Sequence, residues 1–146
     1  MKYYLLFAWV FLLGSCQSGD TDSAEAVDKP LNEWAEAYFS FNYKEALVYM
    51  TPESEKWIRY AASNITEQDI QYINEHNKDV RTEIVDRYIM AGDTTCSAHI
   101  RVSDFVQLGF VGQNGKVVDQ AEFQVELVKR NGKWLIRMEG PLQNGK

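Results

Sequence analysis

Apolar residues follow helical spacing in the first half of the chain and alternate with polar residues in the second half. Between residues 28 and 76 they recur every three or four positions, which is typical of amphipathic helices. Pro30, Thr51-Pro52 and Thr66 have the residue types that favour helix starts. Asn42 precedes a further short apolar pattern and is predicted to cap it in a capping box with Glu45.

The alternating half predicts four strands separated by turns rich in glycine, asparagine and aspartate. Their expected ranges are 80–90, 94–106, 117–128 and 133–139. Asn131 and Gly132 tolerate positive φ and predict a two-residue hairpin, so the last two strands should pair antiparallel. Residues 105–111 either extend the second strand or form an apolar loop in which Gly109 marks a bulge.

Helices followed by an antiparallel sheet predict an α+β domain whose helices cover one face of the sheet. The alternation assigns that face. Its expected members are Cys96, Ala98, Ile100, Val102, Ala121, Phe123, Val125, Leu127, Trp134, Ile136 and Met138. The opposite face carries charges of both signs that can pair across strands, which favours a monomer over a sheet-to-sheet dimer.

The N-terminus has the pattern of an export signal. The apolar run from Tyr3 to Leu13 is 11 residues long, about half the roughly 20 residues that a membrane-spanning helix needs. Leu13-Gly14-Ser15-Cys16 resembles the lipobox of bacterial lipoproteins, which implies a signal peptide over residues 1–15 and a lipid on Cys16. The alternative is a soluble secreted protein that is cleaved nearby.

Residues 16–27 are small, polar and acidic, and they predict a flexible tether ahead of a domain over residues 28–146. Removal of residues 1–15 leaves 131 of the 146 residues and takes away the charge of Lys2, so the net charge of −6 becomes −7. With Cys16 lipidated, Cys96 has no disulfide partner and is expected to be buried. Gln17, in place of the aspartate associated with inner-membrane retention in enteric lipoproteins, favours the outer membrane.

Composition narrows the classes of function. With 45% hydrophobic and 13% aromatic residues, the chain has enough apolar side chains for one well-filled domain. The net charge of −6 and the lack of a basic cluster exclude a nucleic-acid binder. The sequence has no metal-ligand spacing and no glycine-rich phosphate loop, so neither a metal nor another cofactor is expected.

Two segments, EWAEAYFSFNYKEALVYMTPES and VELVKRNGKWLIRM, resemble the nuclear transport factor 2-like superfamily, also called cystatin-like. They are most similar to its small bacterial lipoproteins of unknown function. This resemblance implies a strongly curved sheet that wraps the long first helix into a cone, often with a cavity. The superfamily includes ketosteroid isomerase-like enzymes, polyketide cyclases and members without catalysis, so the fold alone does not fix an activity.

An isomerase-like site would need a base and a hydrogen-bond donor inside the cone. Tyr38 lies on the predicted buried stripe and could supply the donor, or its hydroxyl could bond to a backbone carbonyl. Asp86 is in phase with Ile84 and could point inward, or it could lie at a bulge. The residues of the candidate pocket, which could equally be core, are Trp34, Tyr38, Phe41, Asp86, Tyr88 and Trp134.

Phe105, Leu108 and Phe110 form a candidate partner surface if helix or sheet does not cover them. No acid and base point convincingly inward, so no catalytic residue is assigned. We therefore expect a lipid-anchored envelope protein that binds a small apolar ligand or an envelope protein. The alternatives are an isomerase-like enzyme or small-lipid binder using Tyr38 and Asp86, and an assembly subunit of an envelope complex.

Overall fold

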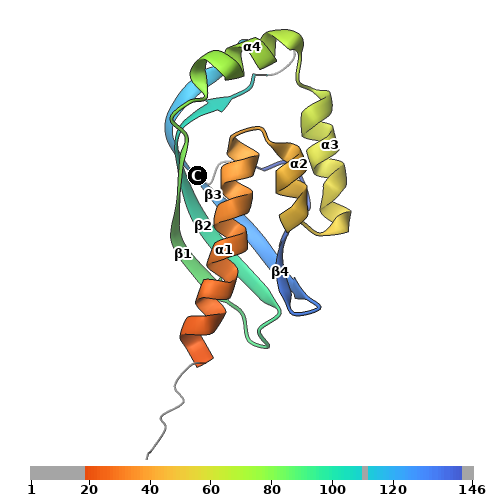
Figure 1. The fold of residues 1–146 in the computed structure, drawn as a ribbon, viewed down its shortest axis with the longest axis vertical. Coiled ribbons are helices and arrows are strands. Elements are labelled where there is room, and N and C mark those ends of the chain that lie inside the picture. Colours follow the sequence, from red (N-terminus) through yellow and green to blue (C-terminus); the bar gives the residue numbers. More distant parts are fainter. Residues whose placement is uncertain (1–18, 110–111, 143–146) are drawn as a thin grey trace, which may run out of the picture.

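In the computed structural model, which describes residues 19–109 and 112–142, a four-stranded antiparallel sheet curves around the first helix (Figure 1). The helical segments are α1 (Gly19–Phe39), α2 (Tyr43–Ala46), η1 (Leu47–Tyr49), η2 (Pro52–Ser54), α3 (Glu55–Ser63) and α4 (Glu67–His76). The strands, which pair in chain order, are β1 (Arg81–Ile89), β2 (Thr95–Gln107), β3 (Lys116–Arg130) and β4 (Lys133–Arg137). The predicted α+β class is confirmed.

Helix α1 begins earlier than the sequence predicts. It starts at Gly19 and continues through Pro30, so residues 19–27 of the predicted tether are helical. Pro30 lacks the amide that would continue the helical hydrogen bonds, but the fully buried Val27 and Leu31 hold the helix against the sheet on both sides of it. Cys16 and the predicted signal peptide lie outside the described residues. No helix in the described part of the chain is long and apolar enough to cross a membrane.

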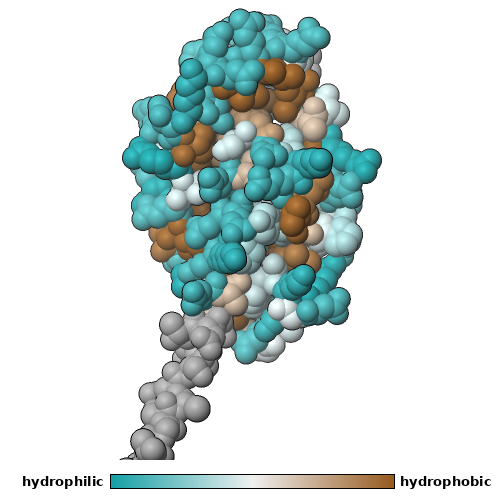
Figure 2. Space-filling view, viewed as in Figure 1, coloured by the Kyte–Doolittle hydropathy of each residue, from teal (hydrophilic) through white to brown (hydrophobic). Residues whose placement is uncertain are grey.

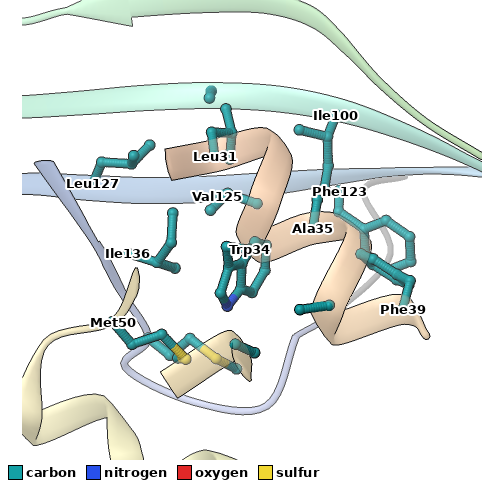
Figure 3. Close-up of a cluster of buried hydrophobic side chains, with 14 of the residues drawn as sticks. Leu31, Trp34, Ala35, Phe39, Met50, Ile100, Phe123, Val125, Leu127 and Ile136 are labelled. Carbon is teal, nitrogen blue, oxygen red and sulfur yellow. The ribbon is translucent and has the colours of Figure 1, made fainter. Parts of the chain in front are cut away.

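The core lies between α1 and the concave face of the sheet (Figure 3). Leu31 and Trp34 on α1 are fully buried and face side chains from β2, β3 and β4. The apolar positions predicted on the second, third and fourth strands all belong to this cluster or pack against it. The alternation of the sequence therefore assigned the inner face of these three strands correctly.

The opposite face of the sheet carries the predicted cross-strand charge pairs. Arg101 on β2 reaches Glu83 on β1 at 3.2 Å and Glu122 on β3 at 2.9 Å. Arg137 on β4 pairs with Glu126 on β3 at 3.0 Å. These pairs join partly exposed arginines to exposed or partly exposed glutamates, so each contributes little to stability.

Strand β4 is fastened to the segment that links η1 and η2. The Thr51 amide donates to the Ile136 carbonyl at 2.9 Å, and the Ser54 hydroxyl accepts from the Met138 amide at 2.8 Å. Thr51 precedes η2 at the N-cap position, but its side chain makes no capping hydrogen bond. Its hydroxyl lies 2.7 Å from that of Ser54. The predicted capping box at Asn42 does not form either, because its amide donates to the Glu45 carboxylate at 2.7 Å.

The end of β3 and the start of β4 are joined by the predicted hairpin turn. Asn131 and Gly132 in this turn have φ values of 52° and 77°. These positive values confirm the turn that the pair was expected to make. Lys129 continues the antiparallel ladder by pairing with Trp134.

Helix α4 lies across the far end of the sheet (Figure 1). Its predicted N-terminal cap is confirmed as a full capping box between Thr66 and Asp69. No residue of α4 is fully buried. Just beyond its end, the side-chain amide of Asn77 donates to the Phe39 carbonyl at 3.0 Å and accepts from the Val106 backbone N–H at 2.9 Å. The Asn77 side chain therefore joins the ends of α1 and α4 to β2.

Candidate functional site

Four aromatic side chains form a continuous strip along the C-terminal half of α1 and into α2. The Trp34 and Tyr38 rings stack with centroids 5.0 Å apart, and Tyr38 lies 5.6 Å from Tyr43. Phe41 follows at 6.0 Å from Tyr43. Phe41 has a φ of 61°, a left-handed conformation that ends α1 and turns the chain into α2. We call these four residues the aromatic strip.

The aromatic strip holds polar atoms in apolar surroundings. Trp34 is fully buried, and its Nε1 has no hydrogen-bond partner among the residues that the structure describes. Burial raises the pKa of Tyr38 to about 12. Burial and the neighbouring Tyr38 also raise the pKa of Tyr43. At neutral pH the strip therefore offers uncharged N–H and O–H donors, which suit a hydrogen-bond acceptor in an otherwise apolar molecule.

Three of the candidate pocket residues, Trp34, Tyr38 and Phe41, are brought together in the aromatic strip. Trp134 is not in ring contact with them within the described part of the chain. It is a buried residue of β4, and the Lys129 ammonium lies 5.9 Å from its ring centroid. The pocket prediction missed Tyr43. The reason is that Tyr43 lies five residues after Tyr38 and beyond the end of α1, so the two residues share no helical periodicity.

Asp86 and Tyr88 do not point into the cone, so this part of the pocket prediction is wrong. Ile84 pairs with Ile100 and Asp86 with His99, which leaves Val85 as the extra residue of a β-bulge. The bulge shifts the alternation by one position. The Asp86 side chain is 67% exposed and lies 3.1 Å from His99 on the outer face, and Tyr88 is 70% exposed.

The same bulge turns Arg87 inward. Its Nε lies 2.8 Å from Oδ1 of Asp28 on α1, and both side chains are about two-thirds buried. Apart from this ion pair, Asp28 Oδ1 has no hydrogen-bond partner in the described part of the chain. This contact could not be predicted from the pattern of residues, because a charged residue in an alternating strand is expected to face water.

Phe105 belongs to the core and not to a partner surface, so that prediction is also wrong. Asp104 has a φ of 55°, and this left-handed residue turns the chain so that the next side chain points inward. Phe105 is 4% exposed, and its ring lies 5.4 Å from Phe39 and 5.8 Å from Phe123. Leu108 is half-buried, and Phe110 lies outside the described residues.

The first part of the segment extends the second strand, as one of the two alternatives predicted, because β2 continues to Gln107. Gly109 lies beyond the end of β2 and is not part of a bulge in the strand. A Cβ at this position would lie 2.8 Å from Cβ of Gln113. Close approach of two chain segments therefore explains the glycine.

The remaining titratable groups of the described residues do not assemble a reactive centre. Cys96 is 1% exposed, as expected, and burial raises the pKa of its thiol. No group of three or more His, Cys, Asp or Glu residues that could hold a metal occurs in residues 19–109 and 112–142. A shallow depression of about 460 Å³ is lined by Asp79, Val80, Arg81 and Asp104. Arg81 and Asp104 already pair there at 2.6 Å.

Comparison with known proteins identifies no family for the chain. No family model and no curated protein matches it. Among solved structures, it is similar to AclR, described as "a putative hydroxylase", from Streptomyces galilaeus, at 17% identity and a TM-score of 0.43. The match covers 80% of this chain and 81% of that chain. The α+β assignment rests on the helices and strands of the chain itself.

Proposed function

We propose that the chain is a lipid-anchored protein of the cell envelope whose nuclear transport factor 2-like domain binds a small apolar ligand without transforming it. The anchor is supported by the apolar run that ends at Leu13-Gly14-Ser15-Cys16. Acyl chains on Cys16 would hold the protein on a membrane, because each buried CH₂ contributes about 0.8 kcal/mol. The outer membrane is the membrane that Gln17 favours.

The observation that carries the ligand-binding part is the unpartnered indole N–H of Trp34. A buried donor without an acceptor costs roughly 1–3 kcal/mol, and a carbonyl or hydroxyl oxygen of a ligand would recover that energy. Tyr38 stacks on the same ring, so the oxygen would lie among aromatic faces. The ligand class is a compact apolar molecule with one hydrogen-bond acceptor.

Catalysis has less support than binding. An isomerase-like reaction needs a carboxylate near Tyr38, but the Asp86 carboxylate is exposed on the outer face of the sheet. Arg87 and Asp28 neutralise one another between α1 and β1. Tyr38, with a pKa of about 12, is not a base at neutral pH.

The assembly-subunit alternative also loses support. It needs an exposed apolar surface at residues 105–110, and Phe105 is buried against Phe39 and Phe123. A large exposed apolar patch, rather than a single side chain, marks a protein-binding surface.

Nile red tests the proposal, because it is neutral and apolar, has one carbonyl oxygen and fluoresces in apolar sites. We expect saturable binding to the detergent-solubilised mature protein. Trp34→Phe keeps an aromatic ring but removes the N–H, and it should weaken binding about 5- to 10-fold, as expected for one hydrogen bond of about 1–1.5 kcal/mol.

Trp57→Phe is the matched control, because Trp57 Nε1 is also buried without a partner in the described residues but lies on α3, outside the aromatic strip. It should leave the affinity unchanged. Thermal unfolding of both variants checks that they are folded. Binding that does not saturate, or equal affinities of the wild type and a folded Trp34→Phe variant, would contradict the proposal.

A further inference from the structure

The start of α1 leaves very little chain between the proposed anchor and the folded domain. Only Gln17 and Ser18 separate Cys16 from Gly19, the first residue of α1. Three residue steps reach about 10 Å at most, whereas a free tether of the length predicted from the sequence would have a root-mean-square reach of roughly 20 Å. A connection this short restricts which part of the domain can face the membrane.

One end of the molecule holds the start of α1 together with two hairpin turns (Figure 1). The turns are the β1–β2 connection at residues 90–94 and the β3–β4 connection with its flanking residues, 129–133. They are joined by a hydrogen bond of 2.8 Å from the Lys129 amide to the Thr94 carbonyl. We call this the proximal end. Helix α4 lies at the opposite end of the long axis.

The β3–β4 turn of the proximal end carries cations, although the whole chain is acidic and the first two turns of α1 add Asp20, Asp22 and Glu25 to the same end. Lys129, Arg130 and Lys133 occur within residues 129–133 and are all exposed. Arg130 already pairs with Glu53 at 2.6 Å, whereas neither Lys129 nor Lys133 forms an ion pair with a residue that the structure describes. The other turn adds Met90, which is 43% exposed, and one acidic residue, Asp93. Lysine side chains near a membrane are attracted to anionic headgroups.

We propose that the proximal end rests on the anionic, phosphate-bearing headgroup layer of the membrane that holds Cys16. Lys129 and Lys133 contact the phosphates, and Met90 reaches the boundary of the acyl region. The inference rests on the anchor in the proposed function. Its consequence is that α4 and the aromatic strip, which lies toward the C-terminal end of α1, face away from the membrane. The ligand would then enter from the aqueous side.

Short-range fluorescence quenching tests this orientation. Thr94→Cys, at the proximal end, and Gln68→Cys, on α4, each carry an environment-sensitive dye in a Cys96→Ser background. Both replaced residues are exposed. The lipidated proteins are reconstituted into vesicles of phosphatidylcholine and phosphatidylglycerol that contain a lipid with a headgroup nitroxide. We expect strong quenching at position 94 and none above background at position 68, because α1 alone separates the two ends by about 30 Å.

Two controls separate the effect of the short connection to Cys16 from the effect of the two lysines. A twelve-residue glycine-serine insertion between Ser18 and Gly19 keeps the anchor and the fold but frees the orientation, so quenching at position 94 should fall toward that at position 68. The double variant Lys129→Gln/Lys133→Gln should also reduce quenching at position 94, and the reduction should be absent in vesicles of phosphatidylcholine alone.

Flotation of the vesicles separates the two possible failures. If the protein floats with the vesicles but positions 94 and 68 are quenched equally, or position 68 is quenched more, the orientation is refuted and the anchor stands. If the protein made in its native cells does not float, the anchor of the proposed function is refuted and the orientation with it.

Discussion

Helices α1 and α4 are both amphipathic, but they are held in the fold by different interactions. On α1, Val27, Leu31 and Trp34 are fully buried against the sheet. On α4 no residue is fully buried, although its N-terminus has a complete capping box. Figure 2 shows hydrophobic surface below the polar top of the molecule. Ile70 of α4 is 50% exposed. The difference shows that capping can define where a helix begins, while burial decides how much it contributes to stability.

Truncation of one apolar side chain on each helix should have very different effects on stability. Leu31→Ala should lower the free energy of unfolding by about 2–5 kcal/mol, because it shortens a fully buried side chain and leaves a cavity behind. Ile70→Ala on α4 should lower it by less than about 1 kcal/mol, because half of that side chain is already in water. Urea unfolding measures both. Equal losses would show that α4 is as firmly packed as α1.

The Arg87–Asp28 ion pair tests how far α1 also depends on polar contacts. Arg87→Met should destabilise the fold by about 1–2 kcal/mol, because it leaves a partly buried carboxylate without its cation. The control is Arg59→Met, which removes an exposed pair with Glu55 within α3 and should cost less than about 0.5 kcal/mol. If Arg87→Met lowers the free energy of unfolding no more than Arg59→Met does, the ion pair that the bulge at Val85 makes possible does not stabilise the fold.

Removal of the cap should affect α4 locally. Thr66→Ala should cost about 1 kcal/mol and should increase hydrogen exchange at the first amides of α4 while those of α1 stay protected. Asn42→Ala is the matched control, since Asn42 makes no side-chain cap and should have a smaller effect. Unchanged exchange in α4 would mean that tertiary contacts, not Thr66 and Asp69, fix its start.

A surface ion pair should give the smallest effect, visible only in acid. The Arg130 guanidinium, with a smaller backbone contribution, holds the pKa of Glu53 at about 2 against an ordinary 4.5. The pair stabilises the fold fully above about pH 4.5, and this contribution is lost as the pH falls toward 2. Glu53→Gln should therefore have a melting temperature slightly below the wild type at pH 6 and close to it at pH 2. An equal difference at both values would contradict the assignment.

The elements of this fold could be predicted because they depend on local pattern. Alternation assigned the inner faces of β2, β3 and β4, Asn131-Gly132 identified the hairpin, and Thr66 with Asp69 identified the start of α4. In each case the residues that give the signal are also the residues that make the contact.

The failures occur where one residue changes the geometry for its neighbours. The bulge at Val85 moved Asp86 outward and Arg87 inward, and the left-handed Asp104 moved Phe105 into the core. An aspartate with positive φ or an extra residue in a strand leaves no periodic signal, since both are stabilised by contacts distant in sequence. The aromatic strip was found only in part for the same reason, because Tyr43 joins it across the turn at Phe41.

Mass spectrometry of the protein from the membranes of its native cells tests whether Cys16 carries a lipid. We expect a chain that begins at Cys16, with a mass increased by a glycerol-linked pair of acyl chains. An intact Met1 together with an unmodified Cys16 would contradict the lipid anchor and everything inferred from it about how the domain meets the membrane.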